Sequence, residues 1–125
     1  MALVRRYVDA VNSGGLEVID DLFASDYVNH RPTGPEVGPA AMREFVASVR
    51  KTLPDISMSI DEMIADGDKV GVRVTLRGTS TVFGRSVTIP EIQIYRIANG
   101  TIAERWFVVD RSELQQSASA TSKGE

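Results

Sequence analysis

The 125-residue sequence contains no cysteine. This absence excludes disulfide bonds, cysteine–zinc sites and thiol nucleophiles, and it leaves the redox compartment undetermined. The chain has a single histidine, which excludes a metal site built from several histidines. A calcium loop needs regularly spaced acidic residues, and no stretch of the sequence has that spacing. We therefore expect no metal site.

Long apolar runs and a surplus of positive charge are missing as well. No segment is long enough to span a membrane, and the N-terminus lacks the apolar core of a signal peptide, so we expect a soluble, cytoplasmic protein. The net charge is −3, whereas nucleic-acid binding requires a clustered basic surface. We expect neither nucleic acid nor a membrane as a partner. The length suits one domain with a single core.

The spacing of the apolar residues changes along the chain. Steps of three and four predict helices over residues 2–12, about 16–23 and about 39–52. An extended segment at 25–32 and a loop at 33–39 precede the third helix. Alternation with period two then predicts four strands with hairpin signals between them. These strands cover about residues 57–65, 70–77, 86–97 and 102–110.

The order of these elements predicts an α+β domain whose helices cover one face of a curved, mainly antiparallel sheet. Such packing leaves room for an apolar pocket between the helices and the sheet, and that pocket is the expected ligand site. Residues 117–125 are small and polar, so they are predicted to form a disordered tail.

The last predicted strand ends in a carboxylate. Because strand side chains alternate, Trp106, Val108 and Asp110 point the same way. A carboxylate among apolar neighbours is costly to keep charged, which raises its pKa and makes it useful in proton transfer. In the alternative interpretation Asp110 caps the strand and meets water, and the spacing alone favours that alternative.

His30 is the second candidate acid/base residue, since its ordinary pKa suits proton transfer near neutrality. The alternative is that it anchors the loop at 33–39. Glu91 and Gln93 share a strand face with Tyr95. If that face is concave, Gln93 could orient a substrate carbonyl, and otherwise it meets solvent or a partner subunit. Further candidates could line the pocket or simply fill the core, namely Tyr7, Tyr27, Phe45, Val72, Trp106 and Val108.

Several short motifs follow one another in a fixed order. They are Asp26-Tyr-Val-Asn-His30, Pro32-x-Gly34, Gly38-Pro39, Leu53-Pro-Asp55, Asp66-Gly-Asp68-Lys-Val70, Arg77-Gly-Thr79, Tyr95-Arg-Ile-x-x-Gly100-x-Ile-x-Glu104-x-Trp106, and Asp110. Together they resemble the SnoaL-like polyketide cyclases of the nuclear-transport-factor-2-like (NTF2-like) superfamily. The resemblance covers about residues 2–116, and it implies a single cone-shaped domain over residues 1–116.

The resemblance also implies a chemistry. Polyketide cyclases close a ring by an intramolecular aldol reaction without metal or organic cofactor. The position of Asp110 matches their acid/base aspartate, with His30 assisting. The implied ligand is a polyketide-like or other apolar carbonyl compound. Because this superfamily also includes proteins without catalysis, the alternatives are a small-ligand binding protein and a purely dimerising module.

The exposed face of the sheet predicts a homodimer. If that face is the one opposite Val72 and Val74, it carries polar side chains that could meet a second copy. The residues proposed for this face are Arg73, Thr75, Arg77, Gln93 and Tyr95.

Overall fold

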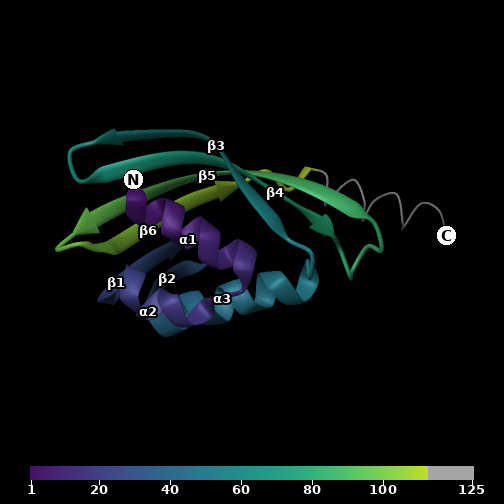
Figure 1. The fold of residues 1–125 in the computed structure, drawn as a ribbon, viewed down its shortest axis with the longest axis horizontal. Helices are drawn as coiled ribbons and strands as arrows, with labels where there is room; N and C mark the ends of the chain where they lie inside the picture. The colour runs from purple at the N-terminus through teal and green to yellow at the C-terminus, as the bar shows by residue number, and fades with distance from the viewer. Residues whose placement is uncertain (113–125) are drawn as a thin grey trace.

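The computed structural model describes residues 1–112. The predicted tail at 117–125 and the last residues of the predicted domain lie outside the described residues. In the described part, three α-helices and a short 3₁₀ helix pack on one face of a curved sheet (Figure 1). The predicted α+β class is therefore confirmed. The helices are α1 (Ala2–Ser13), η1 (Leu16–Val18), α2 (Ile19–Leu22) and α3 (Pro39–Thr52).

Residues 1–112 contribute six strands to one sheet, in the order β2-β1-β6-β5-β4-β3. All neighbouring strands are antiparallel except β1 and β6, which are parallel. The strands are β1 (Phe23–Arg31), β2 (Gly34–Val37), β3 (Ser57–Asp66), β4 (Lys69–Thr79), β5 (Ser86–Ala98) and β6 (Thr101–Val109).

Two of these strands differ from the prediction of four. The segment predicted as extended is strand β1, and the segment predicted as a loop contains the short strand β2. β1 pairs with β6 across more than seventy residues of sequence, His30 lying opposite Trp106. Short-range patterning carries no information about such a parallel partner.

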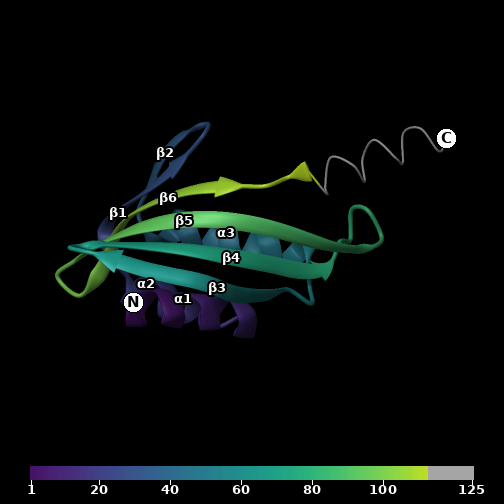
Figure 2. The same cartoon turned by 90° about the horizontal axis from the view of Figure 1, so that it is seen from above.

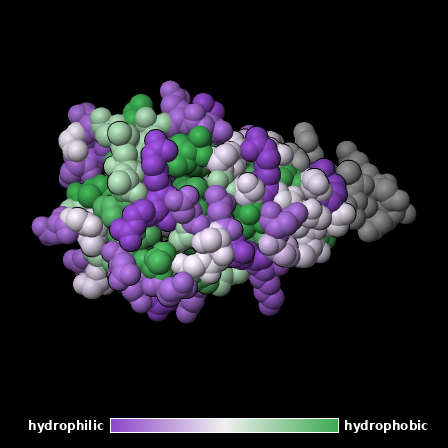
Figure 3. All heavy atoms as spheres, viewed as in Figure 1, coloured by the Kyte–Doolittle hydropathy of each residue, from purple (hydrophilic) through white to green (hydrophobic). Residues whose placement is uncertain are grey.

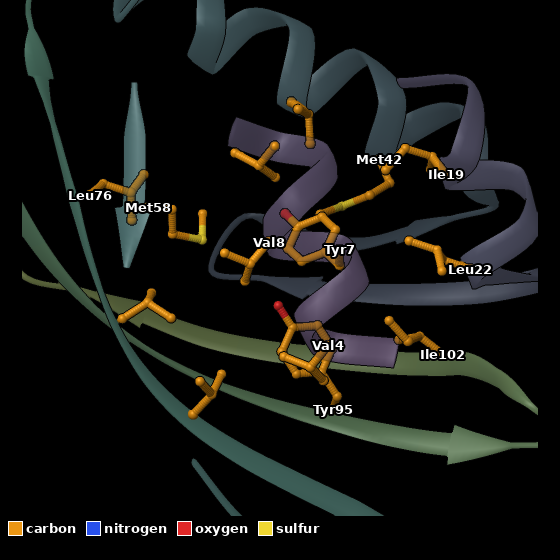
Figure 4. Close-up of a cluster of buried hydrophobic side chains, with 14 of the residues drawn as sticks. Val4, Tyr7, Val8, Ile19, Leu22, Met42, Met58, Leu76, Tyr95 and Ile102 are labelled. Atoms are coloured by element: carbon orange, nitrogen blue, oxygen red, sulfur yellow. The ribbon is translucent and has the colours of Figure 1, made fainter. Parts of the chain in front are cut away.

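Each helix buries the face that its apolar spacing predicts. In α1 the buried side chains include Val4, Tyr7 and Val11, and the helix ends at Gly14, whose φ of 78° is the left-handed conformation expected at a helix exit. Side chains from α1, α2, α3 and the sheet meet in a single core (Figure 4).

The hairpin between β5 and β6 is set by Asn99 and Gly100. Their φ angles are 52° and 74°, and two consecutive positive φ values are typical of a type I′ turn. This turn fixes which residue of β5 lies opposite which residue of β6, so that Ile94 pairs with Trp106 and Glu91 with Val109.

Two strands carry an extra residue that reverses the alternation of their side chains. In β3 the register shifts at Asp61, so that Met63 faces the core and Ile64 faces outward. In β6 the shift falls at Ala103, between Ile102, which is buried, and Glu104. Beyond such a bulge every following side chain changes face. The bulge at Ala103 therefore decides which residues of β6 reach the interior.

The two faces of the sheet have different environments. The inner face packs on α1 and α3, whereas Figure 2 shows the outer face with the strands lying in front of α3. None of the helices in the described part of the chain combines the length and apolar character needed to cross a membrane.

The free edge of β3 is fastened to the end of α1 by Asn12. Its side-chain Nδ2 donates to the carbonyl of Met58 at 2.9 Å, and its Oδ1 accepts from the Met58 N–H at 2.6 Å. The amide thereby satisfies two backbone groups that a further strand would otherwise pair.

Replacing Asn12 with alanine should lower the free energy of unfolding by about 1 to 2 kcal/mol, because two backbone groups of Met58 lose their partners. Urea denaturation measures the change. The matched control is Ser13→Ala, which removes two long hydrogen bonds at the end of the same helix, one to the Ala10 carbonyl at 3.5 Å and one from the exposed Gly15 N–H at 3.3 Å. Equal stability of the two variants would contradict the role given to Asn12.

Candidate functional site

The candidate site is a cavity of about 410 Å³ between α1, α3 and the inner face of the sheet. That volume falls within the range of small-molecule sites. Its walls are mainly apolar, with a few charged and polar groups. The lining residues are Tyr7, Val11, Arg31, Pro32, Thr33, Phe45, Val46, Val49, Leu53, Met58, Leu76, Ile89, Glu91, Arg105, Phe107, Val109 and Arg111.

A buried ion pair stands in the wall of this cavity. The Arg105 Nη2 lies 3.0 Å from the Glu91 Oε1, and the two side chains are 1% and 7% exposed. Arg105 belongs to β6 and Glu91 to β5. Burial disfavours the charge on Arg105, but the neighbouring Tyr95, Tyr7 and Glu91 outweigh that effect and raise its pKa above the ordinary value.

The remaining donors of Arg105 are also paired. Its Nη1 donates to Asn29 Oδ1 at 3.2 Å, and its Nε donates to the Tyr95 hydroxyl at 3.4 Å. The guanidinium also lies 4.3 Å from the centre of the Phe107 ring, a cation–π distance. Strands β1, β5 and β6 thus hold one cation in a fixed position.

The two oxygens of Glu91 differ. Oε1 accepts hydrogen bonds from Arg105 and from Gln93 Nε2, each at 3.0 Å. Oε2 accepts none from any residue in 1–112. The carboxylate is therefore oriented through one oxygen and retains the other for a ligand in the cavity.

Three tyrosines surround this group, and all are buried. Burial raises the pKa of Tyr95 to about 12 and raises the pKa values of Tyr7 and Tyr27 further above the ordinary value. The Tyr95 hydroxyl donates to Gln93 Oε1, and the Tyr27 hydroxyl lies 3.7 Å from the sulfur of Met42.

The Tyr7 hydroxyl differs from the other two, since it has no hydrogen-bond partner among residues 1–112. Tyr7 projects from α1 into the core and lines the cavity (Figure 4). Because its raised pKa keeps the hydroxyl protonated near neutrality, Tyr7 can donate a hydrogen bond to a ligand oxygen.

Two of the predicted ligand contacts, Tyr7 and Phe45, lie in the cavity wall. The Phe45 ring lies 6.2 Å from that of Phe107. Their contact with a ligand stays a prediction.

The expectation that Asp110 is sheltered beside the pocket is wrong. Asp110 is exposed and is not among the residues that line the cavity. Hydrogen bonds from the side chain and the backbone N–H of Ser112 hold its pKa below the usual value, the opposite of the expected direction. The cause is the bulge at Ala103, which turns the even-numbered residues that follow it outward.

His30 lies on the outer face as well. Its ring stacks on Trp106 with the centres 4.8 Å apart and the planes 3° from parallel. Its Nε2 lies 2.8 Å from Glu104 Oε2, and Arg96 contacts the other oxygen of that carboxylate. The hydrogen bond from His30 and then that from Arg96 lower the pKa of Glu104. The structure thus brings His30 and Trp106 together, but away from the cavity.

The other three predicted contacts also lie outside the cavity wall. Val108 is 72% exposed on the outer face, whereas Val72 and Tyr27 are buried in the core. The structure favours the interpretation as core residues for Val72 and Tyr27, whereas Val108 and Trp106 lie on the outer face of the sheet and neither line the cavity nor fill the core.

The predicted outer face needs a second correction. Gln93 and Tyr95 are fully buried on the inner face, with Glu91 beside them, while Arg73 and Arg77 are exposed on the outer face. Thr75 lies on the outer face but is only 9% exposed. The concave alternative, in which Gln93 faces the interior, is therefore the correct one.

Sequence reasoning missed the central pair, Glu91 and Arg105. A signal for Glu91 was present, because Glu91, Gln93 and Tyr95 alternate with Ile92 and Ile94. The usual rule assigns the isoleucines to the core. Within residues 1–112 no group of three potential ligands is arranged to hold a metal ion.

Comparisons with known proteins agree with the fold. A family model described as SnoaL-like polyketide cyclase matches residues 1–117. TsrD from Streptomyces laurentii is 25% identical, with a TM-score of 0.85 over 95% of this chain and 93% of that one. IdmH from Streptomyces antibioticus is 23% identical, with a TM-score of 0.83 over 94% of this chain and 96% of that one. A SnoaL-like polyketide cyclase from Agrobacterium tumefaciens is 18% identical, with a TM-score of 0.81 over 93% and 94%.

The raised pKa values of the three tyrosines predict how the protein responds to alkali. A neutral buried tyrosine stabilises the fold fully below pH about 10, where an exposed tyrosine ionises, and the stabilisation is lost as the pH rises toward the folded-state pKa. The near-ultraviolet absorbance of phenolate should therefore increase only together with the loss of circular dichroism. Reversible titration near pH 10 in the folded protein would contradict the burial of these side chains.

Proposed function

The chain belongs to the SnoaL-like polyketide cyclase family, and from this premise we propose that its cavity binds an apolar carbonyl compound and catalyses an aldol-type ring closure without a cofactor. Family membership supports a cyclase- or isomerase-type function in general. The single observation that carries the finer proposal is the arrangement of Glu91, with one oxygen fixed by Arg105 and the other free of protein partners in the cavity wall.

In the proposed reaction Glu91 Oε2 takes a proton from a carbon beside a carbonyl group. The electron pair of that C–H bond moves to the carbonyl oxygen and forms an enolate. The Tyr7 hydroxyl donates a hydrogen bond to that oxygen, as a neutral buried tyrosine can. The enolate carbon then attacks a second carbonyl of the same molecule, and a carbon–carbon bond forms. The proton held by Glu91 passes to the new alkoxide, which restores the carboxylate.

The apolar walls contribute by holding the substrate folded. Both reacting carbons belong to one molecule, so a cavity that keeps them close supplies much of the acceleration. Phe45 and Phe107 provide flat surfaces on one side of the cavity, and Met58, Leu76 and Ile89 provide aliphatic contacts. This composition favours a flat, apolar ligand with a few oxygen atoms.

The sequence-based hypothesis gave the acid/base role to Asp110. We propose Glu91 instead, because Glu91 lines the cavity while Asp110 has an exposed carboxylate with a lowered pKa. A non-catalytic binding protein remains the alternative function, and it would use the same cavity. The cytoplasmic location stays a prediction of the sequence.

We also propose that the protein forms a homodimer through the outer face of the sheet. Large apolar side chains gather there, with Ile64, Ile92 and Val108 exposed by 68%, 56% and 72%. Ile94 lies opposite Trp106 of β6 and opposite Gly71 of β4, and Ile64 of β3 packs over Gly71, so the apolar side chains extend from β3 to β6. By contrast, the side of the molecule seen in Figure 3 mixes hydrophilic and hydrophobic side chains.

A second copy of the chain fits this surface because a two-fold axis can place one apolar patch on the other. Contiguous exposed apolar patches of this kind mark interaction sites in soluble proteins. The charged groups beside the patch pair within the chain, Arg73 with Glu62 and Arg96 with Glu104. They therefore leave no unpaired charge of one sign to oppose the approach of a second copy.

Glu91→Gln should reduce the rate of ring closure by about a hundredfold or more, because the amide cannot accept the proton. Binding should change by less than about threefold, since an amide oxygen can still accept from Arg105. The measurements are turnover of a polycyclic aromatic diketone and its dissociation constant from calorimetry. Asp110→Asn is the matched control and should keep the wild-type rate. Loss of turnover in Asp110→Asn alone would restore the sequence-based assignment, and binding without turnover by the wild type would favour the non-catalytic alternative.

Val108→Glu should convert the dimer to a monomer, because it places a charge in the apolar patch, opposite Ile92. Light scattering coupled to size-exclusion chromatography should give about twice the chain mass of 13.6 kDa for the wild type and the single mass for the variant. The control is Val82→Glu, since Val82 is 70% exposed in the loop between β4 and β5. A monomeric wild type would rule out the proposed dimer.

A further inference from the structure

A second hollow, of about 570 Å³, adjoins the candidate site at the outer end of α3. The two spaces share lining residues from α3, the end of β1 and the segments around β5 and β6, so they adjoin each other along these side chains. We refer to the two spaces together as the channel. The shared residues are Arg31, Phe45, Val49, Leu53, Ile89 and Arg111. The outer space is bordered by polar groups such as Ser48, Thr52 and Ser80.

The charges are distributed unevenly along this channel. At the inner end Arg105 and Glu91 neutralise each other, and the rest of that wall is largely apolar. The other two charged residues that line the inner space, Arg31 and Arg111, are both positive, and both also border the outer space. Two positive side chains therefore lie where the two spaces meet, and the acidic residues Glu36 and Glu44 border the outer space.

The two arginines at this junction are not equivalent. The Arg31 Nη1 lies 3.0 Å from Glu36 Oε1, and its guanidinium lies 5.5 Å from the centre of the Phe45 ring. Arg111 forms no ion pair or hydrogen bond with any residue in 1–112. Glu44 also borders the outer space, but it forms no ion pair with either arginine. We call the junction of the two spaces the mouth of the channel. There a ligand can pair with Arg111 without breaking an existing ion pair.

We propose that the ligand of this cavity carries a carboxylate at one end and that Arg111, aided by Arg31, binds that carboxylate at the mouth of the channel. A planar guanidinium matches the two oxygens of a carboxylate, and the exposed Arg111 side chain is accessible to such a group. The substrate class is therefore an apolar carbonyl compound with an acidic end.

This assignment also gives the ligand an orientation. The carboxylate at the mouth directs the apolar body inward along Phe45, Leu53 and Ile89. The carbonyl groups at the far end then lie toward Tyr7 and Glu91. The reverse orientation would bring the carboxylate next to the free oxygen of Glu91, and two like charges in an apolar cavity repel strongly. The inference rests on the proposed function, because it names the ligand of the same site.

The test compares two probes that differ only in charge, anthraquinone-2-carboxylate and anthraquinone-2-carboxamide. Calorimetric titration of the full chain should give a dissociation constant for the carboxylate that is lower by about fivefold to tenfold. Arg111→Gln should remove most of that preference and change carboxamide binding by less than about twofold. Arg5→Gln makes the same change in net charge on α1, outside the channel lining, and should leave the preference intact. High salt should weaken the preference in the wild type.

The other outcomes separate this inference from the proposed function. Equal binding of both probes by the wild type, or a preference that survives in Arg111→Gln, would overturn the carboxylate assignment and leave the cavity as the ligand site. Val49→Trp fills the channel where the two spaces meet and should abolish the binding of both probes. Full binding by that variant, with a normal thermal unfolding profile, would overturn the ligand cavity itself together with this inference. Failure of both probes to bind the wild type would do the same.

Discussion

The fold buries a guanidinium and a carboxylate together, and the free-energy cost of removing these two charges from water constrains the rest of the structure. Each charge taken out of water costs several kcal/mol unless it is well paired, and the pair Arg105–Glu91 is almost fully enclosed. The cost is offset because Asn29, Gln93 and Tyr95 complete the hydrogen bonds around the pair. The pair and its partners belong to β1, β5 and β6, so the pair remains satisfied only if all three strands keep their register. A movement of any of these strands would separate the paired charges, and the cost of doing so keeps this wall of the cavity rigid.

Much of the architecture follows from local patterning. The apolar stripes of α1 and α3, the alternation in β4 and β5, and the turn at Asn99-Gly100 are short-range features, and the structure confirms the elements that they predict. The partnership of β1 with β6 could not be predicted in the same way. It joins segments that are distant in sequence, and the hydrogen bonds of a parallel pair leave no trace in the spacing of either strand.

The site was harder to predict than the fold because it depends on whether the odd-numbered or the even-numbered residues of β6 face the interior. One additional residue at Ala103 exchanges the faces of every side chain after it, so Arg105, Phe107 and Val109 point inward and Trp106, Val108 and Asp110 point outward. An alternating sequence fixes which residues share a face but not which face is internal. The same ambiguity explains Glu91 and Gln93. Their inward position contradicts the ordinary rule for polar residues. It is favourable because Arg105 on the neighbouring strand pairs with Glu91, and because Gln93 bonds to Glu91 and Tyr95.

The tight turn at Asn99-Gly100 helps to fix which residues of β5 and β6 face the interior. If β5 slipped by one position against β6, Glu91 and Gln93 would leave the interior, and so would the buried Val87, Ile89 and Tyr95. Arg105 would then lose its carboxylate partner, and a buried charge without a partner is strongly unfavourable. A two-residue loop with both φ angles positive leaves no slack for the slip. Two loop residues that do not line the cavity therefore help to keep the buried ion pair together.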